Sequence, residues 1–170
     1  MSRPRVVLVG PMGAGKTTVG ALLADGWGVA LRDTDADVEA HQGRSVQEIF
    51  VDDGEPAFRA LEREAVAAAL AEHDGVLALG GGAVMDPATR DRLAGHTVVF
   101  LRVGLADAAS RVGLASSRPL LLGNVRGQLK KILDERAAVY AGVASAVVDT
   151  DGRGPAEVAE AVRAALEVPA

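Results

Sequence analysis

A glycine-rich segment near the start of the chain has the spacing of a phosphate-binding loop. Residues 10–17 read GPMGAGKT and match the pattern G-x-x-x-x-G-K-[ST]. Glycines let successive backbone N–H groups face an anion, and a following helix adds the positive end of its dipole. In this pattern Lys16 reaches the β- and γ-phosphates, and the Thr17 hydroxyl ligates Mg²⁺. The segment predicts binding of a nucleoside triphosphate, with these contacts: Gly13, Ala14, Gly15, Lys16, Thr17 and Thr18.

The residues on either side supply the strand and the helix that such a loop requires. An apolar run ending at Val9 indicates a buried parallel strand, and residues 18–25 carry apolar side chains at helical spacing. The alternative is a glycine-rich turn with a surface lysine. It is disfavoured because lysine is scarce, and this composition would produce the pattern by chance in roughly three chains per thousand.

Composition limits the remaining possibilities. The 170 residues correspond to about one domain, and the net charge of −5 comes with arginines scattered along the chain. Nothing therefore indicates a nucleic-acid-binding surface. The absence of cysteine excludes disulfides and thiol catalysis and fits a reducing compartment. No uncharged stretch is long enough for a bilayer, and the first apolar run ends in the glycine loop, so we expect a soluble cytoplasmic protein.

Strand-like and helix-like segments alternate along the chain. This order predicts an α/β fold with a parallel sheet covered on both faces, and ligands of such sheets bind beyond the carboxyl ends of the strands. We expect strands at 5–9, 29–31, 76–79, 97–103 and 146–148. We expect helices at 16–25, after the capping box that starts at Ser45, at 55–72, 87–93, 107–112 and 125–140, and from Pro155 onward.

Two aspartates follow the second expected strand. Asp33 and Asp35 are two residues apart, so both side chains point to one side if strand geometry continues through them. A carboxylate near phosphates can hold Mg²⁺, usually through water, or can accept a proton from an attacking hydroxyl group. The third expected strand ends in glycines, which leaves Asp33 as the natural metal carboxylate. The alternative is a solvated turn or a helix N-cap.

Other candidate residues have ordinary structural explanations when each is taken alone. Residues 80–82 are three glycines, which fit either a flexible turn or close approach of the backbone to a ligand. Arg59 could pair with Glu55 four residues earlier on a helix. Arg118 lies in a loop and could close over ATP as part of a lid, whereas Arg136 is ambiguous by itself.

In order and spacing, these elements resemble the shikimate kinase family over nearly the whole chain. The resemblance is carried by the phosphate loop, Asp33-Thr34-Asp35, Gly54-Glu55-x-x-Phe58-Arg59, Gly80-Gly81-Gly82, Arg118-Pro119-Leu120, and Arg136 followed by Tyr140. It implies the nucleoside-monophosphate-kinase-like fold, with five parallel strands in the order 2-3-1-4-5 and helices on both faces. It also implies one domain over 1–170, with a shikimate-binding part at about 35–63 and a lid at about 113–123.

The same resemblance implies an activity and a role for each acceptor-side residue. The reaction would transfer the γ-phosphoryl group of MgATP to the 3-hydroxyl of shikimate, in aromatic amino-acid (chorismate) biosynthesis. Asp35 would orient or deprotonate that hydroxyl, and Arg59 and Arg136 would bind the carboxylate. Gly81 would donate its amide N–H group to the substrate, with Gly80 and Gly82 shaping the turn.

For the nucleotide side, the resemblance implies that Lys16 and Arg118 stabilise the transferring phosphate. Thr17 would ligate Mg²⁺ directly and Asp33 through water. The residues implied beside adenine are Arg111, Arg153 and Pro155. The family resemblance also favours a monomer.

The chain departs from the family pattern after Arg136. Family members commonly read Arg-x-Pro-x-Tyr, whereas this chain has Ala138 in place of the proline, and we expect the backbone next to Arg136 to be freer as a result. Two alternatives remain. One is another small-metabolite kinase such as gluconate kinase, which the Asp-Thr-Asp and triple-glycine motifs disfavour. The other is a non-catalytic sensor, which the presence of Lys16, Asp35 and Arg118 disfavours.

The only tryptophan, Trp27, is expected to serve packing. Its place in the sequence, just before the second expected strand, suggests that its fluorescence could report substrate binding.

Overall fold

Five parallel strands form the centre of the protein, and their order is the predicted one. The structure is a computed structural model that describes residues 3–104, 106–107 and 125–167. The sheet order is β2-β3-β1-β4-β5. The strands are β1 (Val6–Val9), β2 (Leu31–Asp33), β3 (Val76–Ala78), β4 (Val98–Arg102) and β5 (Ala146–Asp149). All four strand pairs are parallel, which brings the carboxyl ends of the strands to one edge.

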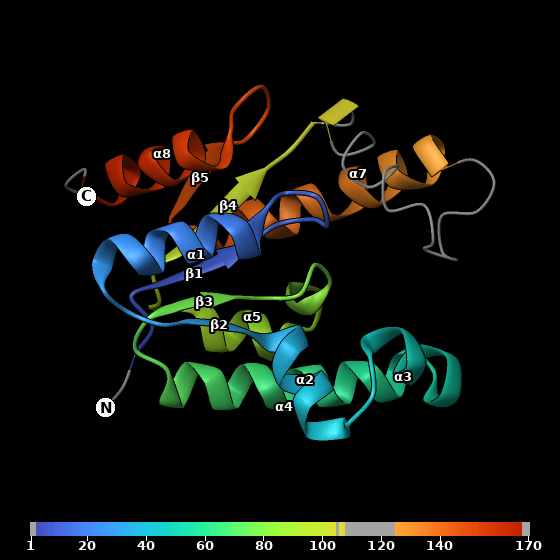
Figure 1. Cartoon of the computed structure of the whole chain (residues 1–170). Helices are drawn as coiled ribbons and strands as arrows, with labels where there is room; N and C mark the ends of the chain where they lie inside the picture. The colour runs from blue at the N-terminus through green and yellow to red at the C-terminus, as the bar shows by residue number, and fades with distance from the viewer. Residues whose placement is uncertain (1–2, 105, 108–124, 168–170) are drawn as a thin grey trace.

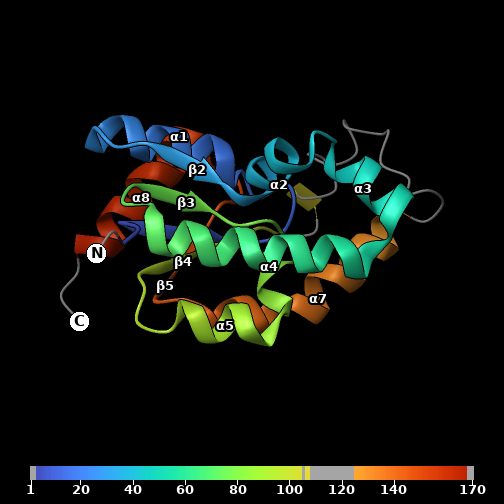
Figure 2. The ribbon, with the colours of Figure 1, turned by 90° about the horizontal axis from the view of Figure 1, so that it is seen from below.

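Helices cover both faces of this sheet (Figures 1 and 2). Helices α1 (Lys16–Trp27) and α8 (Pro155–Glu167) pack on one face. Helices α4 (Glu55–Glu72), α5 (Pro87–Leu93) and α7 (Val125–Val143) pack on the other. Helices α2 (Thr34–Gln42) and α3 (Val46–Asp53) lie beside α4, and a short 3₁₀ helix, η1 (Ala83–Met85), follows β3.

Alternating side chains of the strands build two cores. In β1, Val6 and Leu8 point to the core under α1 and α8, whereas Val7 and Val9 point to the core under α4, α5 and α7. All four are buried, because a parallel sheet between two helical layers has no solvent-facing side. This two-sided burial explains why the strand reads as a continuous apolar run.

A third, smaller core supports the predicted shikimate-binding part, residues 35–63. Val38 of α2, Ile49 of α3 and Phe58 of α4 form it. Helix α3 starts with the predicted capping box, in which the Ser45 hydroxyl accepts from the Glu48 amide and the Glu48 carboxylate accepts from the Ser45 amide. Asp86 caps α5: its side chain accepts a hydrogen bond from the Ala88 amide at 2.8 Å.

The second strand was predicted wrongly by two residues. It spans Leu31–Asp33 instead of 29–31, because α1 runs to Trp27 and Gly28 ends it in the left-handed conformation, with φ 66°. The chain then turns directly into α2, which starts at Thr34 and is capped by Asp33. Strand geometry therefore does not continue through Asp35, which lies in the first turn of a helix, and Asp33 is the N-cap of that helix.

Several predictions concern residues outside the described ranges. These are residues 108–112 of the helix expected at 107–112, the lid at 113–123, and the nucleotide-side residues Arg111 and Arg118.

Candidate active site

The phosphate loop connects β1 to α1 at the carboxyl edge of the sheet, at the same end as the turn after β3 and the start of α2 (Figure 1). Gly10 lies tightly against β4, where a Cβ atom would come within 2.6 Å of the Leu101 carbonyl oxygen. Gly13 and Gly15 both have a φ angle of 85°, a backbone conformation that residues other than glycine rarely adopt. The close approach and the turn therefore require glycine at these positions.

Lys16, the first residue of α1, folds back over the loop. Its Nζ donates to the carbonyl oxygens of Gly10 at 2.7 Å and Pro11 at 3.1 Å. Burial lowers the pKa of Lys16 to about 8, although the carboxylates of Asp35 and Asp33 act in the opposite direction. The loop thus holds a cation where phosphates are expected, and a bound anion would favour the charged form of this lysine.

Thr17 and Asp33, predicted together as metal ligands, are hydrogen-bonded to each other. The Thr17 hydroxyl donates to Asp33 Oδ2 at 3.0 Å, while Asp33 Oδ1 accepts from the amides of Asp35 at 2.8 Å and Ala36 at 3.3 Å. Asp33 therefore joins the start of α1 to the start of α2. A hydroxyl and a carboxylate oxygen are hard donors of the kind Mg²⁺ prefers, so this pair fits the predicted metal.

Asp35 lies beside these groups in a partly buried position. Burial, and to a smaller extent the charges of Asp33 and Glu62, raise the pKa of Asp35 to about 6 against the opposing effect of Lys16. A carboxyl group with such a pKa is ionised near neutral pH but is a stronger base than an exposed aspartate. It can therefore accept a hydroxyl proton.

Arg59 on α4 is held by a carboxylate that sequence reasoning missed. Its Nη1 donates to Glu62 Oε1 at 2.7 Å, and the expected Glu55 pair is present at a longer 3.4 Å from Nε. Glu62 is 3% exposed, burial raises its pKa, and its Oε2 has no hydrogen-bond partner among the described residues. A signal was present: Glu62 stands four residues after buried Phe58 and four before buried Val66 on the apolar face of α4.

The three glycines after β3 form a turn into which these side chains pack. A Cβ at Gly80 would lie 2.6 Å from Asp35 Oδ1 and 2.9 Å from Glu62 Oε2. A Cβ at Gly82 would lie 2.5 Å from the Arg59 guanidinium. The turn therefore brings Asp35, Arg59 and Glu62 together because its residues have no side chains.

Gly81 differs from its neighbours. A Cβ there would have its nearest contact at 3.5 Å, on the Met12 amide nitrogen of the phosphate loop. Among the described residues, none accepts a hydrogen bond from the Gly81 N–H group. The predicted amide donor thus lies close to the phosphate loop.

Arg136 lies on α7 within electrostatic range of the same site. Its positive charge lowers the pKa values of Lys16, Glu62 and Tyr140, though burial is the largest influence on each of the three. Helix α7 continues through Ala138 to Val143. The backbone next to Arg136 is therefore regular helix, and the missing proline leaves no irregularity there.

The two described residues predicted beside adenine lie after β5. Arg153 is exposed, and its amide donates to the Thr150 carbonyl at 3.2 Å; Pro155 is the first residue of α8. Both follow the carboxyl end of a strand at the sheet edge that carries the phosphate loop. Their position is compatible with the prediction.

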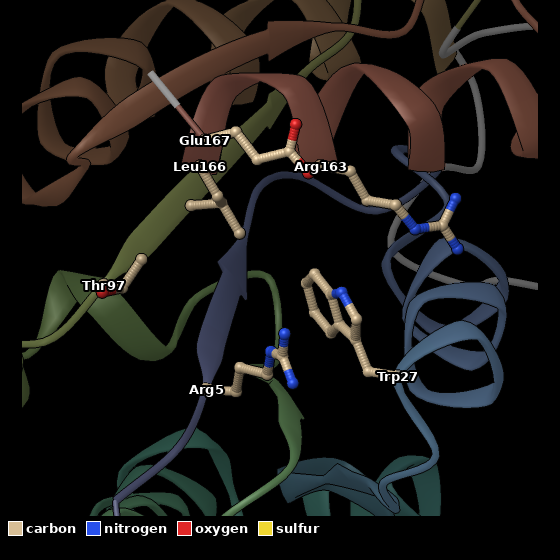
Figure 3. A pocket seen from close by; sticks show the side chains of 6 residues that line it. All are labelled: Arg5, Trp27, Thr97, Arg163, Leu166 and Glu167. Atoms are coloured by element: carbon tan, nitrogen blue, oxygen red, sulfur yellow. The ribbon is translucent and has the colours of Figure 1, made fainter. Parts of the chain in front are cut away.

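Trp27 lies at the opposite edge of the sheet. It is the last residue of α1, and its indole ring packs under the guanidinium of Arg5, whose Cζ is 4.3 Å from the ring centroid (Figure 3). Together with Arg163 and Leu166 of α8, these side chains line a small pocket. The packing role is confirmed, but the suggestion that Trp27 reports substrate binding is not supported, because α1 carries it away from the phosphate loop.

The fold and this site define a class: a phosphate-loop kinase in which a partly buried aspartate lies near the lysine of the loop. The family model described as shikimate kinase matches residues 12–167. A shikimate kinase of Streptomyces avermitilis is 58% identical over 168 residues, which are 99% of this chain and 98% of that relative. One of Salinispora arenicola is 60% identical over 163 residues, covering 96% and 98%. The chain belongs to the shikimate kinase family and is an ATP-dependent kinase that acts on a hydroxyl group of shikimate.

Solved structures agree with this assignment. Shikimate kinase from Acinetobacter baumannii in complex with shikimate superposes with a TM-score of 0.91 at 32% identity, covering 98% of this chain and 93% of that one. A gluconokinase from Sinorhizobium meliloti has a TM-score of 0.56 at 20% identity, over 95% and 90% of the two chains. That likeness shows the fold alone, whereas the shikimate kinase of Salinispora arenicola is 60% identical. The gluconate alternative is therefore disfavoured.

Two features are absent from the described residues. Within these ranges no helix combines the length and hydrophobicity needed to cross a bilayer. Nor do three or more His, Cys, Asp or Glu side chains of the described part gather as a metal site.

Proposed function

We propose that the site transfers the γ-phosphoryl group of ATP to the 3-hydroxyl of shikimate, with Asp35 as the residue that orients and deprotonates this hydroxyl. One observation carries the proposal: Asp35, at the carboxyl edge of the sheet, interacts electrostatically with Lys16 and with Glu62, the carboxylate that holds Arg59. An acceptor hydroxyl at Asp35 would therefore be near both the phosphate loop and a guanidinium group. This arrangement favours in-line transfer by positioning.

The carboxylate of shikimate would be bound by Arg59 and Arg136. A guanidinium group presents a planar fork of N–H donors that matches a carboxylate. Glu62 holds Arg59 through one oxygen at Nη1 and Glu55 accepts from Nε, which fixes the side chain and leaves the Nη2 group for the substrate. The Gly81 amide would donate from the turn between them, while Gly80 and Gly82 keep the space free of side chains.

On the nucleotide side, Lys16 would release the Gly10 and Pro11 carbonyls and donate to the β- and γ-phosphates. Thr17 would hold Mg²⁺ directly and Asp33 through water, since the two side chains already meet. The metal neutralises charge that develops on the phosphates. Gly13, Ala14, Gly15 and Thr18 complete the phosphate contacts. Arg111, Arg153 and Pro155 remain predicted neighbours of adenine, and Arg118 remains the predicted lid residue.

We further propose a single kinase domain that acts as a monomer in the cytoplasm. The absence of cysteine fits a reducing compartment. Sedimentation of the purified protein with and without its substrates measures the oligomeric state, and a dimer would contradict this proposal.

Release of ADP tests the reaction. Purified protein is given MgATP with shikimate or with gluconate, and Lys16→Ala serves as the control because it removes the cation of the phosphate loop. We expect release with shikimate alone and its loss in the variant. Release with gluconate at a similar rate would contradict the substrate assignment. No release with either acid, from protein that still binds ATP, would favour the sensor alternative.

A further inference from the structure

Tyr140 is the only tyrosine of the chain, and it connects α7 to the glycine turn. Its side chain is 1% exposed, and its ring lies on Phe100 of β4 with the centroids 5.0 Å apart. Its hydroxyl donates to the Gly81 carbonyl oxygen at 2.5 Å. This bond joins residues that are 59 positions apart in the sequence, so it fixes one helix relative to the edge of the sheet.

The turn is held at each of its peptide groups. Before Gly81, the Gly80 amide donates to the Thr34 hydroxyl at 3.2 Å, and the Gly80 carbonyl accepts from the Ala83 amide at 3.1 Å. After it, the Gly81 carbonyl accepts from Tyr140, and the Gly82 carbonyl accepts from the Met85 amide at 3.1 Å.

Three successive glycines have no side chains of their own to restrict the backbone. Partners from α2 and α7, together with the Ala83 and Met85 amides of η1, therefore determine where the Gly81 N–H group points. Of these partners, Tyr140 is the one that also belongs to the helix carrying Arg136.

Tyr140 stands four residues after Arg136, so the two side chains lie on the same face of α7, one turn apart. Fixing Tyr140 to Gly81 thereby fixes the distance between the Arg136 backbone and the glycine turn.

We propose that Tyr140 is a positioning residue for the acceptor: through Gly81 and α7 it holds the Gly81 N–H group and the Arg136 guanidinium in place to bind one carboxylate. This inference rests on the proposed roles of Gly81 and Arg136. It assigns Tyr140 to shikimate binding and leaves nucleotide binding independent of its hydroxyl.

The variant Tyr140→Phe keeps the ring on Phe100 and removes the hydroxyl. We expect the KM for shikimate to rise about five- to tenfold, the effect of losing one hydrogen bond in a buried site. We expect kcat and the KM for MgATP to stay within about twofold, because the substrate carboxylate is bound equally in the ground state and the transition state. The measurement is steady-state kinetics with each substrate varied in turn.

Ser145→Ala is the matched control. The Ser145 hydroxyl also bonds to backbone groups, accepting from the Val98 amide at 3.2 Å and donating to the His96 carbonyl at 3.4 Å. It lies at the amino end of β5, at the opposite edge of the sheet. We expect both KM values of this variant to match those of the wild type.

An unchanged KM for shikimate in folded Tyr140→Phe would overturn the proposal. So would a parallel rise of both KM values with a lower melting temperature, because that is the effect of a general structural role. Failure of the wild type to phosphorylate shikimate would instead overturn the proposed function, so the two failures are distinguishable.

A second measurement needs no variant. Because Tyr140 is the only tyrosine, growth with fluorotyrosine labels this position alone, and fluorine NMR then gives one protein signal. We expect saturating shikimate to shift this signal and gluconate to leave it unchanged. An unmoved signal in labelled protein that turns over shikimate would also overturn the proposal.

Discussion

The guanidinium group of Arg59 lies directly against the backbone of Gly82. A Cβ atom at Gly82 would come within 2.5 Å of Nη2 and 2.7 Å of Nη1. Arg59 is at the same time held by Glu62 at 2.7 Å, so it can move neither into the turn nor away from it without losing a contact. The glycine turn and the arginine thus define each other's position.

Gly82→Ala should therefore displace the tip of Arg59. We expect the KM for shikimate to rise about tenfold or more, as for the loss of a charge-assisted hydrogen bond. The melting temperature should also fall, because displacing Arg59 leaves the buried Glu62 carboxylate without its cation. Gly142→Ala on α7 is the control: nothing lies within 4 Å of its Cβ, and alanine there favours the helix by about 0.5–1 kcal/mol. Steady-state kinetics that give equal KM values for the two variants would refute the Arg59 assignment.

Substitutions at Asp33 separate its two roles. Asp33 caps α2 and accepts from the Thr17 hydroxyl. Serine is also a good N-cap, so Asp33→Ser should keep the free energy of unfolding within about 0.5 kcal/mol, whereas Asp33→Ala should lose about 1 kcal/mol. Both variants lack the carboxylate and should need more Mg²⁺ for half-maximal turnover. Urea denaturation and Mg²⁺ titrations measure the two effects, and an unaltered Mg²⁺ requirement in both would remove Asp33 from the metal site.

The value of kcat/KM should fall at low pH for shikimate and at high pH for MgATP. Asp35, whose pKa burial raises to about 6, must be ionised to accept a proton, so kcat/KM for shikimate should fall as the pH drops through about 6. Lys16, whose pKa burial lowers to about 8, must be charged to bind phosphates, so kcat/KM for MgATP should fall as the pH rises through about 8. A shikimate profile that stays flat from about pH 5 to 7 would contradict the role of Asp35 as base.

Asp35→Asn should stabilise the protein while nearly abolishing turnover. The folded-state pKa of Asp35, about 6, lies above the ordinary value of 3.8. The protonated form therefore contributes stability that is fully present below the ordinary value and is lost as the pH rises through about 6. Asparagine stays neutral and keeps this contribution, worth about 1–3 kcal/mol at about pH 8. Urea denaturation at about pH 4 should show little difference between variant and wild type, and a less stable variant at about pH 8 would contradict the prediction.

Much of the molecule follows from local sequence. The phosphate loop, the capping box at Ser45 and the span of α4 were predicted correctly because each depends on residues within a few positions of one another. The strand order also followed, but from the family resemblance rather than from any local pattern. The second strand was predicted two residues too early, because the end of α1 and the start of β2 are only a few residues apart and the sequence does not mark the boundary between them.

What only the tertiary structure decided is how distant groups meet. Asp33 and Asp35 would have pointed to one side if strand geometry had continued through them, yet a helix starts between them, and Asp33 joins Thr17 from across the sheet edge. Glu62 drew no prediction from the sequence and Tyr140 was only part of a motif, whereas in the folded protein they contact Arg59 and Gly81. The physical reason is range: caps, turns and helical faces depend on neighbours in the chain, whereas burial, pKa shifts and contacts between α7 and the glycine turn exist only once the layers have packed.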